Sequence, residues 1–474
     1  MPEDSTNCNV QSSSVAVVGG GLAGLAAACA LAQSGYQVTL FERRPYLGGR
    51  ASSYEHPATG EIVDNCQHVL FGCCTNLLDF YETIGIENKI RWFDRMTFIE
   101  PGGRQSILEP GFLPAPLHVT PSFLRFRFLR ARDKAMLSRA LAALMMRTYE
   151  DDGTSFQDWL IRHHQTPAAI DRFWKPILVS ALSEDINRIS VPYAAQVVRE
   201  SMKSRNARAM GIPAVPLSHL YDAAKDYILS HGGTVRMRAS IQSCGADTSV
   251  RAAGSGSTVR LRLQDAEQQF DYAVLALPFE QAAKILPDSP DFQPLREKIQ
   301  HFESSPITGV HFWFDRQITD LPHAVLLDRT IQWMFHKSLL LTKDARGSYV
   351  ELVISSSKSL IEKSRQEIID LALRELHEFF PRARDASLVK ATVIKELKAT
   401  FSPTPGIDRY RPAQQTPWPS IILAGDWTAT GWPATMEGAV RSGYLAAQQI
   451  AGKTFLVPDL PATGLMKLLD KRQK

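Results

Sequence analysis

The hydrophobic pattern near the N-terminus predicts a strand, a helix and a second strand in close succession. Residues 15–18 form a short uninterrupted apolar run, and a glycine-rich turn leads from it into a helix of small apolar residues. Gly35 follows directly where this helix is expected to end, and residues 38–41 form a second apolar strand that finishes at Glu42. A strand, a helix and a strand in this order are typical of an α/β fold with a parallel sheet.

Similar elements recur at two later places in the chain. Residues 218–229 carry a helical pattern, residues 234–237 and 272–278 have the pattern of strands, and a GSGS sequence at 254–257 predicts a hairpin turn. Residues 420–452 predict a strand followed by a long terminal helix. These separate stretches of chain carry the pattern of one type of fold, so we expect an interrupted domain.

The turn after the first strand has the spacing G-x-G-x-x-G, with Gly19, Gly21 and Gly24. Such glycines make a tight turn, let the backbone approach a pyrophosphate, and allow the helix to pack closely on the strand. The N-terminus of the helix then attracts the pyrophosphate. Glu42 is placed to accept hydrogen bonds from ribose hydroxyls and would repel a 2′-phosphate, which favours FAD or NAD over NADP. The dinucleotide-binding residues expected here are Gly19, Gly21, Leu22, Ala23, Gly24 and Glu42.

The residues that follow favour FAD. Past Glu42 the sequence continues with Arg43, the pair Gly48 and Gly49, and Arg50. This continuation resembles the flavoprotein amine oxidase and carotenoid desaturase superfamily, in which the corresponding stretch runs along the pyrophosphate toward the flavin. The resemblance implies FAD as the cofactor, with these four residues in contact with it.

The C-terminal strand and helix resemble the same superfamily. Gly425 and Asp426 end a strand where the resemblance places the aspartate at the ribityl and pyrophosphate end of FAD. Residues 432–447 resemble the closing helix of the family, with Trp432, Thr435 and Met436 at the cofactor. Pro433 suits the first position of that helix, and the positive end of the helix dipole would stabilise reduced flavin.

The predicted fold is α/β, and α+β overall, with two domains, as the length of 474 residues also suggests. A Rossmann-like FAD-binding domain is expected from discontinuous segments, beside a substrate domain of helices and a mixed sheet. The FAD-binding domain is assigned to 14–95, 212–285 and 415–452, and the substrate domain to 96–211 and 286–414. Residues 1–13 are expected to be a disordered tail, and residues 453–474 a C-terminal tail.

A dense polar segment, Asp64-Asn65-Cys66-Gln67-His68, follows a strand-like stretch and precedes a helix. Its order D-N-x-Q-H after a G-G-R motif resembles the hydroxysqualene dehydroxylases, also described as squalene-associated FAD-dependent desaturases, although position 66 is cysteine here instead of glycine. The resemblance implies a thirty-carbon polyprenyl substrate that loses an allylic hydroxyl, with hydride from flavin N5. That reaction needs a general acid, so we expect His68 as the acid and Asp64 as the group that orients it. The alternative for His68 is an ordinary core or capping histidine.

Two features bear on access for an oily substrate. Residues 111–117 and 122–132 interleave bulky apolar side chains with arginines, which suits an entrance held against an anionic membrane. An ordinary packed cap is the alternative, because the alternation is less regular than an amphipathic helix requires. The C-terminal sequence GLMKLLDKRQK is a second candidate for membrane contact.

Composition excludes several classes of protein. A net charge of +4 is too small to imply nucleic acid binding, and no transmembrane helix is expected. Six cysteines without an even framework favour reduced thiols in a cytoplasmic protein, peripheral on the inner face of the cytoplasmic membrane if it docks. No metal is expected, because Cys66, His68, Cys73 and Cys74 include no C-x-x-C pair.

Three other functions share much of this pattern. A carotenoid-type desaturase would use the same cofactor motifs to take hydride from a prenyl chain. A non-redox prenyl-lipid carrier, like the Rab escort proteins and GDP-dissociation inhibitors, would not need the intact cofactor residues. An amine oxidase is a third alternative, although no aromatic cage for an amine is visible. Only one dinucleotide fingerprint is present, so the electron donor, whether NAD(P)H or a separate reductase, is unidentified.

Overall fold

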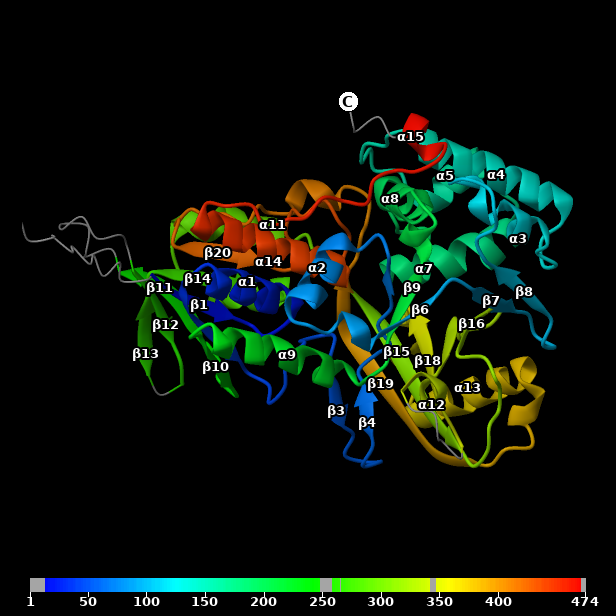
Figure 1. The fold of residues 1–474 in the computed structure, drawn as a ribbon, viewed down its shortest axis with the longest axis horizontal. Coiled ribbons are helices and arrows are strands. Elements are labelled where there is room, and N and C mark those ends of the chain that lie inside the picture. The colour runs from blue at the N-terminus through cyan, green and yellow to red at the C-terminus, as the bar shows by residue number, and fades with distance from the viewer. Residues whose placement is uncertain (1–12, 248–257, 265, 342–346, 470–474) are drawn as a thin grey trace, which may run out of the picture.

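The computed structural model describes residues 13–247, 258–264, 266–341 and 347–469 (Figure 1). The expected tail over residues 1–13, apart from its last residue, and the expected hairpin turn at 254–257 lie outside the described residues. The described chain forms two bodies that meet along a cavity, one built on a parallel sheet and the other on a larger mixed sheet (Figure 1).

The first body contains a five-stranded parallel sheet in the order β10-β2-β1-β14-β20. Its strands are β1 (Ser14–Val18), β2 (Gln37–Glu42), β10 (Thr234–Met237), β14 (Tyr272–Ala276) and β20 (Ile421–Ala424). The predicted strands from both ends of the chain therefore belong to one sheet, with β14 between β1 and β20. The central strands are apolar at almost every position because both faces of a parallel sheet are covered.

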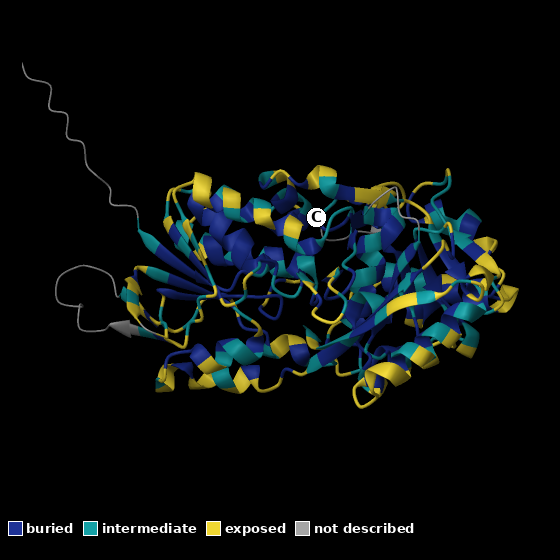
Figure 2. Cartoon of the chain, turned by 90° about the horizontal axis from the view of Figure 1, so that it is seen from below, coloured by how far each residue is buried: buried dark blue, intermediate teal, exposed yellow. Residues whose placement is uncertain are grey.

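Alternate side chains of the central strands enter two different cores. Val15 and Val17 of β1 pack among helices, whereas Ala16 and Val18 face the opposite layer. The helices of the first layer are α1 (Leu22–Gln33), α2 (Thr75–Thr83), α9 (Leu217–Ser230) and α14 (Met436–Ala451). The opposite layer includes an antiparallel sheet of β11 (Ser243–Asp247), β12 (Thr258–Arg262) and β13 (Glu267–Phe270), and the short helices α10 (Phe279–Ile285) and α11 (Gln293–Ile299). The sheet is thus the middle of three layers, dark with buried residues in Figure 2.

The second body contains a seven-stranded mixed sheet in the order β19-β15-β18-β17-β16-β7-β8. Its strands are β7 (Met96–Ile99), β8 (Gln105–Leu108), β15 (Ser304–Phe314), β16 (His323–Leu326), β17 (Trp333–His336), β18 (Ser348–Ser355) and β19 (Leu388–Phe401). Helix α13 (Arg365–Phe379) packs on one face through a core of its own. The other face looks toward the cavity, to which Trp333, Phe335 and Val353 contribute side chains.

A cap of helices closes the cavity on the side away from the parallel sheet (Figure 1). The cap contains α3 (Thr120–Leu124), α4 (Ala131–Met146), α5 (Phe156–Arg162), α6 (Pro167–Ala169), α7 (Lys175–Leu182) and α8 (Val191–Met202). The remaining elements are the hairpin β3 (Ser53–Glu55) and β4 (Ile62–Asp64), the small sheet of β5 (Leu70–Phe71), β6 (Ile90–Phe93) and β9 (Met210–Pro213), and helices α12 (Lys337–Leu341) and α15 (Met466–Leu469).

The C-terminal residues are not a free tail. Residues 453–469, here called the C-terminal strap, run from the end of α14 to the helical cap (Figure 1). The Asn76 side chain donates to the carbonyl of Val457 at 3.3 Å and accepts from the Val457 N–H at 3.0 Å. Farther along, the Thr463 N–H donates to the carbonyl of Lys203 and the Leu465 N–H to the carbonyl of Ala115. The strap therefore ties the two bodies together.

Helices α1 and α14 pack closely because small residues face each other. A Cβ added at Gly443 would overlap the carbonyl oxygen of Ala23 and reach Ala26 at 3.0 Å. No rotamer of a larger residue can avoid a backbone carbonyl, so the two helices would have to separate.

We expect Gly443→Val to lower the free energy of unfolding by at least about 3 kcal/mol, because overpacking against backbone cannot relax through side chains. Thermal and urea unfolding would measure the change. Gly245→Ala is a matched control, because nothing lies within 4 Å of a Cβ added at Gly245. Equal stability of the two variants would contradict the close approach of α1 and α14.

Candidate functional site

A cavity of about 680 Å³ opens at the carboxyl edge of the parallel sheet and continues between the two bodies. This is the edge at which α/β sheets bind ligands, because loops and helix N-termini gather there. All the residues predicted from the sequence for cofactor binding and catalysis line this one cavity, except Gly24 and Asp64. Segments separated by some 400 residues of chain, such as Gly21 and Asp426, thus share one site.

The N-terminus of α1 presents free backbone donors to the cavity. Gly21 is the N-cap residue, no side chain caps the helix, and Leu22 and Ala23 line the cavity. A Cβ added at Gly21 would have only the Cα of Gly49 near it, at 3.8 Å, so open space lies in front of these donors. Unpaired N–H groups at a helix N-terminus beside open space fit a pyrophosphate.

Gly24 has a different role. It does not line the cavity, and a Cβ added there would overlap the carbonyl oxygen of Gly19 and press on Ala276 at 3.2 Å. The third glycine of the motif therefore lets α1 pack on the sheet, which is the role that its spacing predicts.

Glu42 ends β2 and is held in place by two backbone donors. Its carboxylate accepts from the N–H of Gly20 at 2.7 Å and from the N–H of Arg44 at 2.7 Å. The side chain is buried and lines the cavity. Because each carboxylate oxygen can accept more than one hydrogen bond, lone pairs are left for ribose hydroxyls. Arg43 lies exposed at the rim of the cavity beside it.

Arg50, which follows the Gly48–Gly49 pair, forms an ion pair with Asp426, which follows β20. An Arg50 nitrogen lies 2.6 Å from an Asp426 oxygen, and Arg50 also donates to the carbonyl of Ala399 at 2.9 Å. Arg411 fixes the loop that begins at Asp426, because its guanidinium donates to the carbonyls of Asp426 and Thr428. Sequence reasoning missed Arg411, which carries no motif of its own.

The N-terminus of α14 faces the cavity, although the predicted start of this helix is wrong. Pro433 was expected at its first position, but the helix begins at Met436, and the Thr435 hydroxyl caps it by accepting from the Gly438 N–H at 3.1 Å. A hydroxyl at the N-cap stabilises the start of a helix because it accepts from a free backbone N–H, whereas a proline only supplies a suitable φ angle. Trp432, Thr435 and Met436 all line the cavity.

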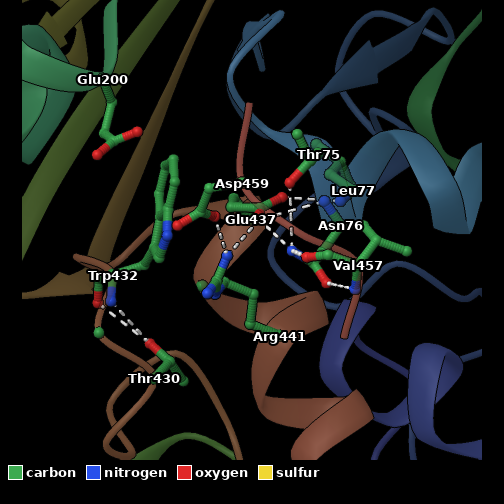
Figure 3. A network of polar contacts seen from close by, with 12 residues as sticks. Thr75, Asn76, Leu77, Glu200, Thr430, Trp432, Glu437, Arg441, Val457 and Asp459 are labelled. Atoms are coloured by element: carbon green, nitrogen blue, oxygen red, sulfur yellow. Dashed lines mark hydrogen bonds and ion pairs between the residues drawn. The ribbon is translucent and has the colours of Figure 1, made fainter. Parts of the chain in front are cut away.

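Glu437, in the first turn of α14, joins this helix to α2 (Figure 3). Its carboxylate accepts from the N–H groups of Asn76 at 3.2 Å and Leu77 at 2.7 Å, and lies 3.3 Å from Arg441. Burial raises the pKa of Glu437, partly offset by these donors. The carboxylate thereby replaces the missing cap of α2, a contact that no local sequence signal announces.

His68 lies on the cavity wall, and its ring is fixed by its own turn. Its Nδ1 is 2.8 Å from the carbonyl oxygen of Cys66, so Nδ1 carries the hydrogen and Nε2 is left as an acceptor. Burial lowers the pKa of His68, so the ring is neutral at pH 7. Cys66 is absent from the residues with positive φ, so this turn accepts a side chain where a glycine occurs in the resembling motif.

The predicted pairing of Asp64 with His68 is wrong. Asp64 does not line the cavity. Its carboxylate lies 2.6 Å from the Lys337 ammonium and accepts from the Ser53 hydroxyl at 2.5 Å and the Leu217 N–H at 3.2 Å. Burial alone would raise the pKa of Asp64, but the ammonium outweighs it and the pKa is lowered. The ammonium at the start of helix α12, far along the chain, thus binds the carboxylate that the local sequence offered to His68.

Away from the sheet the cavity becomes apolar. Its lining there includes Met96, Leu108, Phe123, Leu141, Met145, Phe173, Ile177, Met202, Trp333 and Phe335. Two charged side chains interrupt this surface and were missed by sequence reasoning: Glu200, which pairs with Lys203 at 2.6 Å, and Arg208, which donates to the carbonyl of Asp94 at 3.0 Å. Both come from helical positions whose spacing gives no sign of a site.

Comparison with known proteins agrees with this geometry. Residues 22–451 match the family described as flavin containing amine oxidoreductase. The chain belongs to this family. It is 27% identical over 461 residues to a 15-cis-phytoene desaturase of Synechococcus elongatus, with 93% of this chain and 96% of the relative covered. It is 26% identical over 473 residues to a zeta-carotene desaturase of Synechocystis, with 92% and 96% covered.

Solved structures show the same fold. An oxidoreductase from Methanosarcina mazei superposes with a TM-score of 0.72 at 15% identity, covering 93% of this chain and 100% of the other. Putrescine oxidase superposes with a TM-score of 0.71 at 17% identity, covering 93% and 99%. The expected α/β fold is thus confirmed.

Membership of the flavin-containing amine oxidoreductases makes the chain an FAD-dependent oxidoreductase. The uncapped helix α1, the buried Glu42 and the Arg50–Asp426 pair fit FAD, which would lie between them. Through the described part of the chain, no helix is both long and apolar enough to cross a bilayer. In the same residues, no three potential metal ligands of the His, Cys, Asp and Glu types come together.

We expect Gly21→Val to fold normally but to lose FAD, because the added side chain enters the open space in front of α1 without meeting protein atoms. The ratio of flavin to protein absorbance after purification, with the unfolding temperature, would check this. Gly24→Val is the contrasting variant, because its side chain meets the backbone of Gly19 and should destabilise the fold itself. A yellow Gly21→Val protein would contradict the assignment of this space to the dinucleotide.

Proposed function

We propose that this enzyme acts on a long polyprenyl lipid and reductively removes the allylic hydroxyl of hydroxysqualene to give squalene, a step of squalene and hopanoid biosynthesis. The supporting observation is a single cavity that joins the dinucleotide-binding edge to an apolar end, with His68 of the D-N-x-Q-H segment on its wall. The apolar end suits a hydrocarbon chain, since burying such surface is favourable at roughly 25 cal/mol per Å².

The proposed reaction breaks the allylic C–O bond, adds one proton to the departing oxygen and one hydride to the carbon, and so releases water. FAD, when bound and reduced, supplies the hydride. The electrons reach it from an unidentified donor, such as NAD(P)H or a separate reductase. The allylic system spreads the positive charge left on carbon, and the apolar lining excludes water that would otherwise capture that charge.

The protein's part in the proposed reaction is to move a proton and to hold the chain. We assign the proton transfer to Nε2 of His68, because Nδ1 is engaged by the Cys66 carbonyl. A lowered pKa makes the protonated ring a stronger acid, so the fraction of enzyme that enters the reaction with His68 protonated would pass that proton readily to the leaving oxygen. Asp64 contributes by fixing the turn through Lys337 and Ser53, without touching His68.

Carotenoid-type desaturation is the second candidate, and the relatives favour it, because they are named phytoene and zeta-carotene desaturases. In that reaction the hydride leaves the prenyl chain instead of reaching it. The same cavity would hold the chain, and no general acid would be needed.

Incubating purified enzyme with each substrate in the absence of oxygen distinguishes the two candidate reactions. We expect chemically reduced enzyme to regain its yellow colour with hydroxysqualene and to form squalene in equal amount. Oxidised enzyme that bleaches with a phytoene-type hydrocarbon, and reduced enzyme that ignores the alcohol, would support the desaturase and reject the dehydroxylase.

His68→Gln tests the assignment of the proton. It should keep FAD but lower turnover of hydroxysqualene by about 100-fold, the scale of general acid catalysis. Leu229→Gln, an exposed change on α9 outside the cavity, is the control. Full turnover by His68→Gln would remove His68 from the reaction.

We also propose that the enzyme docks on the inner face of the cytoplasmic membrane at the cap end of the cavity. Exposed large apolar side chains gather on the segments there, and we call them the docking patch: Phe112, Leu117, Leu124, Met146, Leu465 and Leu468. Leu117 both lines the cavity and is 42% exposed, and the strap reaches this place through the bond from Leu465 to Ala115. The patch would let a lipid pass from the bilayer into the cavity without crossing water.

The arginines predicted for membrane contact support docking, but most of the predicted aromatic residues do not. Arg125, Arg127, Arg130 and Arg132 are exposed, and within the described chain no carboxylate pairs with them. Phe123, Phe126, Phe128 and Leu129 are instead buried, and the three phenylalanine rings pack against one another and against Phe98 of β7. These phenylalanines alternate with arginines, and their rings turn into the core because burying each ring removes a large apolar area from water.

We expect Leu468→Glu together with Leu124→Glu to reduce the affinity for vesicles containing anionic lipid, measured by sedimentation, by about 30-fold, since each of the two substitutions costs about 1 kcal/mol. Leu229→Glu is the matched control, because Leu229 is also 45% exposed but lies on α9 of the first body. Equal sedimentation of all three proteins would reject the docking patch.

A further inference from the structure

A buried group of charges lies behind the 64–68 segment. Lys337, the first residue of α12, is 2% exposed, and its ammonium lies 2.6 Å from Asp64 and 3.6 Å from Glu351 of β18. It also donates to the side-chain oxygen of Gln67 at 2.8 Å. One lysine of the second body thus holds two of the five residues in the segment that carries His68.

The contacts continue from Lys337 to His68 and to both bodies. The Gln67 amide donates to the carbonyl of His68 at 2.9 Å. On the other side, Asp64 accepts from the Leu217 N–H and the Ser53 hydroxyl, and this hydroxyl also accepts from the Ser218 N–H. Asp64 is therefore fixed at the N-terminus of α9 in the first body, whereas Lys337 belongs to the second.

Stability does not explain this lysine. Removing an ammonium from water costs several kcal/mol, and a methionine of similar volume usually serves a core as well or better. Its charge is balanced by one carboxylate only, because burial raises the pKa of Glu351 to about 8 and leaves that group neutral at pH 7. A buried charge that lowers stability but contacts three polar side chains is the arrangement expected where the charge fixes the positions of those side chains.

We propose that Lys337 is a positioning residue, which fixes the 64–68 segment against β18 and so sets the orientation and electrostatic environment of the His68 ring at the cavity. This inference rests on the proposed function only for its effect on turnover. Its effect on His68 itself is independent of the substrate.

The groups that act on His68 give a signature that a purely structural role would not show. Besides burial, these are the Cys66 carbonyl and Asp64, which raise its pKa, and Arg50 and Lys337, which lower it. Around Lys337 lie Asp64, Glu351 and Gln67, and the neutral His311 shares the same interior. Removing the ammonium should therefore raise the pKa of His68, and a cation restored at the same position should lower it again.

The experiment uses FAD-loaded protein in four forms: wild type, Lys337→Arg, Lys337→Met, and the double variant Asp64→Asn with Lys337→Met. Lys358→Met is the control, because Lys358 also pairs with a buried carboxylate, Glu184, but its ion pairs are with Glu184 and Asp185, which lie outside the 64–68 segment. The His68 ring resonance of histidine-labelled protein, assigned with His68→Gln, is titrated from about pH 5 to about pH 9. Thermal unfolding, kcat and KM for hydroxysqualene are measured on the same samples.

We expect Lys337→Met to raise the pKa of His68 and to lower kcat by about 100-fold with little change in KM, as a small misplacement of a reacting group does. Lys337→Arg should restore both toward wild type. The neutral double variant should regain stability but keep the low kcat, because Gln67 is still released. It also covers the case in which Lys337→Met alone does not fold.

Two results would overturn the inference. One is a Lys337→Met protein whose only change is a lower unfolding temperature, with the pKa of His68 and kcat as in the control. The other is a double variant with wild-type kcat. If wild-type enzyme turns over no polyprenyl alcohol, the proposed function fails, while the His68 titration still tests the role of Lys337.

Discussion

The cavity depends on the close approach of bare backbone at the carboxyl edge of the parallel sheet. A Cβ at Gly49 would come within 2.9 Å of the Cα of Gly21, so the turn into α1 and the turn after β2 meet only because Gly49 lacks a side chain. The free donors of α1 are left open as a result, and Glu42 can bend back to the Gly20 N–H. The helix N-terminus and Glu42, which would bind the pyrophosphate and the ribose of the dinucleotide, both lie at this meeting point.

A single site on such a scaffold can run redox chemistry in either direction. Desaturation and dehydroxylation both need the apolar end of the cavity and the same cofactor, and they differ in whether a proton must reach an oxygen. What distinguishes this chain is therefore the wall around residues 64–68, where a neutral His68 looks into an apolar space and a buried ammonium stands behind it. The overall fold carries no information on that choice.

The parts that sequence reasoning predicted are those whose signals are local. Gly21, Glu42 and the strands around them follow from spacing within a stretch of about thirty residues, which is the reach of a βαβ unit. Lys337 and Arg411 were missed because each has a partner far along the chain, Asp64 for Lys337 and Tyr193 for Arg411. Glu200 was missed because its ion pair with Lys203 is local, and only the packing of the helical cap brings it to the cavity. The start of α14 was misplaced for a related reason, because Pro433 and Thr435 are both good helix starters and only the packed structure decides between them.

The strand order also governs how the polypeptide matures during synthesis. β1 stands between β2 and β14, and β14 needs β20, whose residues leave the ribosome some 400 positions after those of β1. Until β20, α14 and the strap emerge, Arg50 lacks Asp426 and the nascent first body has an open sheet edge. Holding the cofactor is thus a late event in biogenesis, and chaperones or early flavin supply would matter most while that edge waits for its partner.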